Sequence, residues 1–121
     1  MANLTNSLAA VVQLLGAIGA AIVDLDSGIS LGQAGGGTLN LDVAAAGNTE
    51  VVRAKMCTMG DLGLNDEIED ILITLTGQYH LIRMSGTTMF IYIVLDRAKS
   101  NLAMARKELE QLEKGLEIER R

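Results

Sequence analysis

The chain has 121 residues, of which 49% are hydrophobic, and a formal net charge of −5. We expect a single domain over residues 1–121 with its core over 5–115, because this length suits one domain. With one cysteine and one histidine, the chain can form neither an internal disulfide nor a zinc site that needs two or more His/Cys ligands, and its acidic balance argues against a nucleic-acid partner.

The first 24 residues contain a long apolar stretch. Leu4, Leu8 and Leu15 lie at helical spacing, which predicts a first helix that ends at Gly16. The apolar run 8–23 is short for a membrane span, and no lysine or arginine precedes it as in a signal peptide. We therefore expect a helix and then a strand over 17–24, with no insertion into a membrane, in a cytoplasmic protein.

A turn and a second strand follow. Residues 24–28 read Asp-Leu-Asp-Ser-Gly, which is turn chemistry, and 29–34 returns as a strand, so the two strands form a hairpin. The glycine-rich stretch 32–37 has no Gly-Lys-Ser/Thr after it and is therefore interpreted as a flexible link rather than a phosphate-binding loop.

The second helix is predicted from Thr38 or Asn40 to about Met59, with two apolar stripes. One stripe can cover a sheet and consists of Leu41, Ala45, Val52, Met56 and Met59. The other has smaller side chains that allow another helix to approach closely, namely Val43, Gly47 and Ala54. At 100° per residue, one remaining side of the helix carries Asp42, Thr49, Glu50 and Arg53, and another carries Asn48 and Lys55.

Three β-branched-rich runs, 67–76, 79–84 and 89–95, predict a meander of strands. After Asp70 the first run has no proline, lysine or arginine, and an apolar edge of this kind pairs readily with another chain. We therefore predict that Ile71, Ile73 and Leu75, together with the small-residue stripe of the second helix, form a homodimer interface. The acidic cluster 66–70 is interpreted as a solvated edge, with a hard-cation site as the alternative.

A last helix is predicted from near Arg97, with an apolar seam that starts at Ala98 and continues through Leu102, Ala105, Leu109, Leu112 and Leu116. The element order is therefore α-β-β-α-β-β-β-α, which predicts an α/β (α+β) fold with an antiparallel sheet of five strands and helices on its faces.

Cys57 and His80 are the candidate reactive side chains. Neither lies in a recognised nucleophile motif, and neither has a second histidine or cysteine nearby in the sequence. We expect Cys57 to be a buried or interface-facing thiol and His80 a structural or interface histidine. The protein is therefore predicted not to be an enzyme and to carry no metal or cofactor.

The chain resembles the roadblock/dynein light-chain family in its bacterial form. The resemblance covers nearly all of residues 5–115 and is carried by the element order and by residues 19–24, 26–28, 79–83, 93–97 and 101–106. It implies a roadblock/profilin-like sheet with the second helix on one face and the other two helices on the opposite face. It also implies a homodimer joined through the third strands and the second helices.

The resemblance further implies a regulator or scaffold of small Ras-like GTPases, since a bacterial relative activates a motility GTPase through its paired second helices. On that basis Asp42, Thr49, Glu50 and Arg53 are the expected partner-binding residues, and the alternative for Arg53 is that it pairs with Glu50 or Thr49 on its own helix. Two alternatives stay open: an adaptor in a motor or signalling assembly that has no effect on nucleotide turnover, and a small-ligand sensor.

Overall fold

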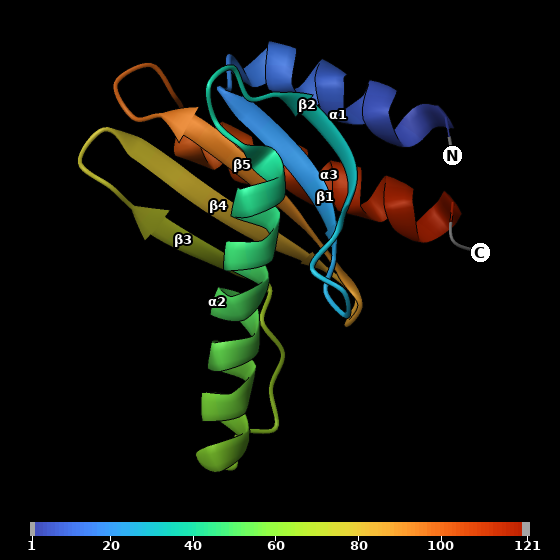
Figure 1. Ribbon diagram of the computed structural model, residues 1–121, viewed down its shortest axis with the longest axis vertical. Coiled ribbons are helices and arrows are strands. Elements are labelled where there is room, and N and C mark those ends of the chain that lie inside the picture. The colour runs from blue at the N-terminus through green and yellow to red at the C-terminus, as the bar shows by residue number, and fades with distance from the viewer. Residues whose placement is uncertain (1, 120–121) are drawn as a thin grey trace.

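The computed structural model describes residues 2–119, with side chains described for 5–116. Its elements occur in the predicted order (Figure 1). They are α1 (Ala2–Leu15), β1 (Gly19–Asp24), β2 (Ser30–Gly35), α2 (Leu41–Asp61), β3 (Asp70–Thr74), β4 (Gln78–Ser85), β5 (Met89–Asp96) and α3 (Leu102–Glu119). None of the helices in this described part is long and apolar enough to cross a membrane.

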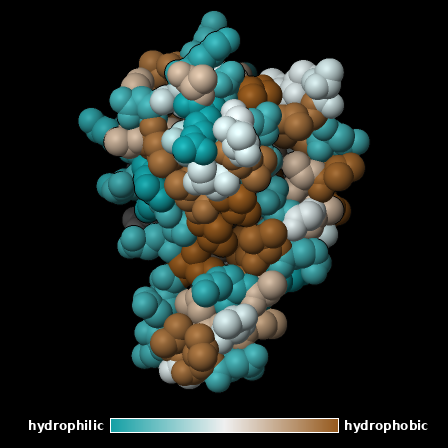
Figure 2. Space-filling view, turned by 90° about the vertical axis from the view of Figure 1, so that its left-hand side faces the viewer, coloured by the Kyte–Doolittle hydropathy of each residue, from teal (hydrophilic) through white to brown (hydrophobic). Residues whose placement is uncertain are grey.

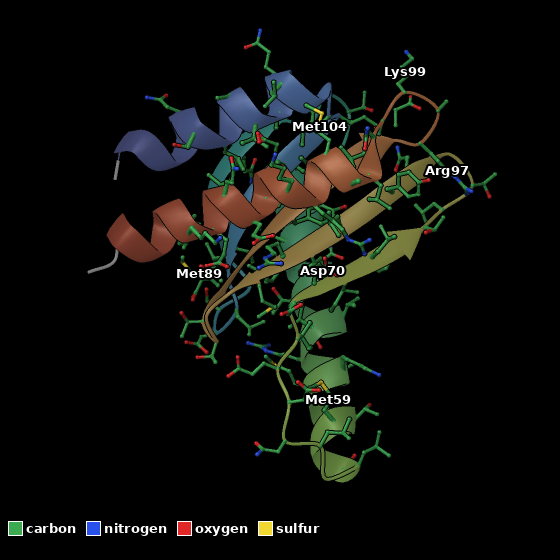
Figure 3. All side chains as sticks on the ribbon, turned by 180° about the vertical axis from the view of Figure 1, so that it is seen from behind. Met59, Asp70, Met89, Arg97, Lys99 and Met104 are labelled. Atoms are coloured by element: carbon green, nitrogen blue, oxygen red, sulfur yellow. The ribbon has the colours of Figure 1, made fainter. Side chains whose placement is uncertain are left out.

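The five strands form one antiparallel sheet in the order β2-β1-β5-β4-β3. The central strands β1 and β5 are buried almost throughout, because helices cover both faces. One core lies beneath α1 and α3, which lie side by side (Figure 3), and a second core lies beneath α2. The predicted fold class and the placement of the helices are confirmed.

Two glycine positions show why the chain turns where it does. Gly16 has φ +62° and ends α1, as the sequence predicts. A Cβ on Gly19 would lie 2.6 Å from the backbone nitrogen of Gly36, so the start of β1 and the link after β2 touch backbone to backbone. This contact holds the glycine-rich link against the sheet and fixes where α2 begins, at the cap residue Asn40.

Two predicted boundaries are wrong. The third strand is confined to Asp70–Thr74 rather than 67–76, because residues 62–69 return alongside the overhanging end of α2 before they pair. The last helix begins at Leu102, not near Arg97, because Asp96 and Asn101 bind the backbone first. The Asp96 carboxylate accepts from the amide of Ala98, and the Asn101 side chain caps the helix through the amide of Met104.

α2 is longer than the sheet that it covers. Its N-terminal half packs on β1 and β2 through Leu41, Ala45, Thr49 and Val52, whereas its C-terminal half extends past the sheet (Figure 1). β3, at one edge of the sheet, and the overhanging part of α2 are therefore two neighbouring structural features that a second molecule can reach.

Candidate protein-interaction surface

β3 is an edge strand that pairs with β4 and with no other strand of the described chain. Ile71 packs against the core beneath α2, and Ile73 lies on the same face because alternate residues of a strand share a face. Both are only half-buried, since α2 covers β1 and β2 instead. The predicted edge position of this strand is confirmed, but its pairing with a second copy stays a prediction.

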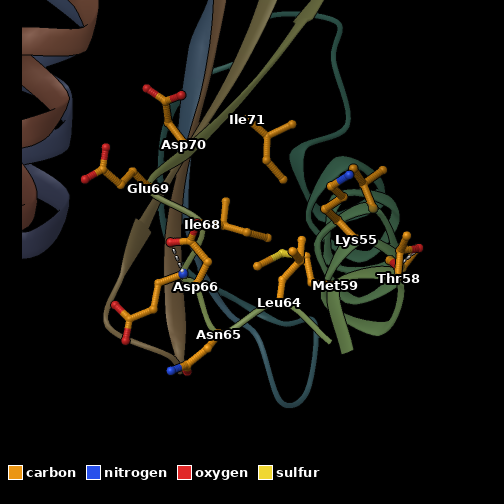
Figure 4. Close-up of a pocket in the computed structure, with 13 residues that line it drawn as sticks. Lys55, Thr58, Met59, Leu64, Asn65, Asp66, Ile68, Glu69, Asp70 and Ile71 are labelled. Atoms are coloured by element: carbon orange, nitrogen blue, oxygen red, sulfur yellow. Dashed lines mark hydrogen bonds between the residues drawn. The ribbon is translucent and has the colours of Figure 1, made fainter. Parts of the chain in front are cut away.

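A groove of about 1460 Å³ separates the C-terminal half of α2 from the segment 64–71. Its helix wall consists of Val51, Ala54, Lys55, Thr58 and Met59. Figure 4 shows Lys55 and Ile71 on opposite walls, and Figure 2, which views the molecule from the β3 side, shows a hydrophobic band across this face. The groove is therefore an open, largely apolar surface beside a free strand edge.

The predicted small-residue stripe of α2 lies outside the core. Val43 is 67% exposed, Gly47 and Ala54 are exposed, and a Cβ on Gly47 would meet nothing within 4 Å. Val51, at 37% exposure, belongs to the same surface and was missed by the sequence analysis, although it follows Gly47 by one helical turn. These four residues do not pack on the sheet, so this surface of α2 is open to a partner helix.

Leu75 lies after β3 rather than within it. Its side chain is 41% exposed, its amide donates to the carbonyl of Gln78, and its carbonyl accepts from Arg97. It therefore belongs to the β3–β4 turn. Its place in a dimer interface stays a prediction.

The expected partner-binding set on α2 needs one correction. Thr49 is 1% exposed, and its hydroxyl donates to the carbonyl of Ala45 at 2.8 Å. This bond satisfies the hydroxyl within the helix and lets Thr49 face the β1–β2 turn, where it packs beside Gly28. Thr49 is therefore a core residue and the prediction that it is exposed is wrong.

The other three members of that set reach the surface, but two of them make contacts of their own. Asp42 accepts a hydrogen bond from the Gln33 side chain at 2.6 Å. Arg53 donates to the carbonyls of Leu25 (2.8 Å) and Asp26 in the β1–β2 turn, and its other terminal nitrogen lies 3.6 Å from Glu50. Arg53 is thus a brace between α2 and the turn, whereas Glu50 makes a surface ion pair with Arg53 and keeps 76% of its side chain exposed.

His80 lies in a chain of hydrogen bonds on the α2 face of the sheet. It pairs across the strands with Ile73, and its ring nitrogens contact the Gln78 side chain at 2.8 Å and the Tyr92 hydroxyl at 2.9 Å. Burial lowers the pKa of His80 below 6.5 and raises the pKa of Tyr92 above 10.0, so the neutral forms of both are favoured. These contacts support a structural role for His80.

The remaining candidate groups offer little chemistry. Cys57 is exposed, so the expectation of a buried thiol is wrong, and its place at an interface stays a prediction. In the acidic cluster, Asp70 pairs with Arg106 at 3.1 Å, and Asp66 accepts from the amide of Glu67. Within the described residues, no group of three or more His, Cys, Asp or Glu side chains is placed to hold a metal ion.

Comparison with known proteins identifies the fold through solved structures. No family model and no curated protein matches the sequence. Among solved structures, MglB of Myxococcus xanthus superposes with a TM-score of 0.86 at 15% identity over 95% of this chain and 85% of that one. A Roadblock/LC7 domain from Streptomyces avermitilis gives 0.84 at 15% identity over 93% of each chain. The gliding protein MglB of Thermus thermophilus gives 0.73 at 15% identity over 94% and 90%. The chain therefore has the roadblock/LC7 fold.

Proposed function

We propose that this protein is a bacterial roadblock-family homodimer that binds a small Ras-like GTPase and has no catalytic activity of its own. The observation that carries the proposal is the open edge of β3 beside the groove under α2, where Ile71 and Ile73 remain half-buried in the single chain. Half-covered apolar side chains next to an unpaired strand edge are a typical self-association surface.

In the proposed dimer the two β3 strands pair and produce one continuous ten-stranded sheet, and each α2 fills the groove of its partner. This arrangement accounts for two features that the single chain leaves unexplained. The C-terminal half of α2 has no sheet of its own to cover, and Val43, Val51 and Ala54 expose small or apolar surface. A partner helix needs small side chains at the contact to approach closely.

The GTPase is proposed to dock on the outer face of the paired α2 helices. Glu50 lies on that face with 76% of its side chain exposed, and two-fold symmetry doubles it. Arg53, in contrast, is already engaged with the β1–β2 turn, so we propose that it supports the docking face rather than anchors the partner. The neighbouring MglB and roadblock structures support the fold on which this proposal rests.

The proposal is tested with a purified small GTPase encoded beside this gene, loaded with GDP or with a non-hydrolysable GTP analogue. We expect the native protein to bind one nucleotide state at least about tenfold more tightly. Glu50→Lys should weaken binding, whereas Leu14→Lys, on an exposed position of α1, should not. No binding in either state would refute the GTPase role. Binding that is equal in both states and leaves hydrolysis unchanged would favour the adaptor alternative instead.

The cytoplasm is the compartment that we propose for this protein, because its lone cysteine suits a reducing environment.

A further inference from the structure

The second free edge of the sheet, β2, carries an exposed apolar surface of its own. β2 pairs only with β1 in the described chain, and the register between the two strands shifts between Ile22 and Val23, which leaves Leu31 without a partner on β1. The strand therefore presents unpaired backbone N–H and C=O groups at this edge, with an irregularity at Leu31. Ile29, just before the strand, is 63% exposed and Leu31, within it, is 49% exposed. This edge lies at the end of the sheet opposite β3 and is not part of the groove described above.

The turn that leads into β2 is held rigidly. The carboxylate of Asp24 accepts from both the amide and the hydroxyl of Ser27, and the Ser27 hydroxyl accepts from the amide of Ile29. Arg53 fixes the same turn to α2 through the carbonyls of Leu25 and Asp26. A strand edge that is fixed before binding loses little conformational entropy when it takes up a further strand.

The charge beside this edge is negative. Asp24 and Asp26 lie in the turn, and Asp42 accepts a hydrogen bond from Gln33 of β2. Arg53, the cation that contacts the turn, is paired with Glu50. Hydrogen bonds from Ser27 hold the pKa of Asp24 below its usual value, so this carboxylate is ionised at neutral pH. A second copy of the same acidic edge would be repelled, whereas a basic segment would be attracted.

We propose that the β2 edge binds an extended segment of a partner protein that alternates basic and apolar side chains and adds to the sheet as a further strand. The backbone of the segment pairs with β2, its apolar side chains cover Ile29 and Leu31, and its basic side chains face Asp26 and Asp42. The site does not require the homodimer, because it lies at the other end of the sheet.

The proposal is tested with three blocked seven-residue peptides as probes: one alternating lysine and valine, one alternating glutamate and valine, and an N-methylated copy of the first that cannot pair its backbone. Binding is measured by fluorescence anisotropy and mapped by amide chemical shifts. We expect saturable binding of the lysine peptide alone, with the largest shifts at residues 30–35. Leu31→Lys should weaken it at least about tenfold, and the matched exposed control Leu14→Lys should leave it within about twofold.

Three results would overturn the proposal. Equal binding of the N-methylated peptide would mean adsorption by charge alone, and shifts at residues 70–74 would place the site on β3. Assembly of the protein beyond a dimer that Leu31→Lys abolishes would mean that a second copy occupies the edge. Ile73→Lys, which is designed to break the homodimer, should leave peptide binding unchanged, so failure of either proposal can be recognised separately.

Discussion

Replacement of Arg53 by methionine tests whether this residue braces the β1–β2 turn. Methionine keeps most of the aliphatic stem and removes the two hydrogen bonds to the carbonyls of Leu25 and Asp26. A hydrogen bond from a charged donor stabilises a fold by roughly 1.5–3 kcal/mol when shielded from water. The Arg53 side chain is 45% exposed, so we discount the pair of bonds to about 1–2 kcal/mol in total.

The corresponding fall in melting temperature is roughly 3–8 °C for a domain of this size. Glu50→Gln is the matched control, because it removes only the exposed ion pair and should cost less than about 0.5 kcal/mol. Both variants are measured by urea unfolding followed by circular dichroism. An Arg53→Met variant within about 0.3 kcal/mol of the native protein would refute the brace, as would an equal loss in Glu50→Gln.

Three further predictions address packing, self-association and pH. Gly19→Ala should cost at least about 2 kcal/mol of unfolding free energy, because the new Cβ meets the backbone of Gly36, and a normal melting temperature would contradict that contact. Gly47→Ala should raise the stability of the single chain by up to about 1 kcal/mol because alanine favours a helix, yet weaken self-association by crowding the partner helix; unchanged association, measured by sedimentation, would remove Gly47 from the interface. Burial holds the pKa of His80 below its unfolded value, so the unfolded chain binds more protons than the folded chain as the pH falls through 6.5. The contribution of neutral His80 to the free energy of unfolding should therefore be fully present above about pH 6.5 and be lost progressively below it. Melting curves from pH 7.5 to 5 should show this slope in the native protein and a smaller one in His80→Gln, and identical slopes would contradict it.

Much of the fold was predictable because local sequence and tertiary packing agree. The buried strand β5 is a continuous apolar run between two turns, and Gly16 and Asn40 end α1 and begin α2 by local rules alone. The pairing of β3 with β4 was also predictable, since only a short turn separates the two strands. A single neighbour in sequence does not by itself make an edge strand, because β5 has one such neighbour and also pairs with β1.

The errors concern residues whose partners are distant or whose polar group is satisfied within its own helix. Thr49 was placed on the surface because a rotation of 100° per residue groups it with Asp42, Glu50 and Arg53, but its hydroxyl bonds the preceding turn of α2, which allows the side chain to be buried. Arg53 was expected either to anchor a partner or to pair with Glu50 or Thr49 on its own helix. It does pair with Glu50, but it also bonds carbonyls 27 and 28 residues away in sequence. No periodicity or spacing reveals contacts of this range.

The most direct test of the central claim is the molar mass of the purified protein in solution, measured by light scattering at micromolar concentration. A homodimer through β3 predicts twice the chain mass of 12.8 kDa for the native protein, the chain mass itself for Ile73→Lys, and an unchanged dimer for Leu31→Lys at the opposite edge. A native protein that has the mass of one chain, or an Ile73→Lys variant that stays dimeric, would contradict the account.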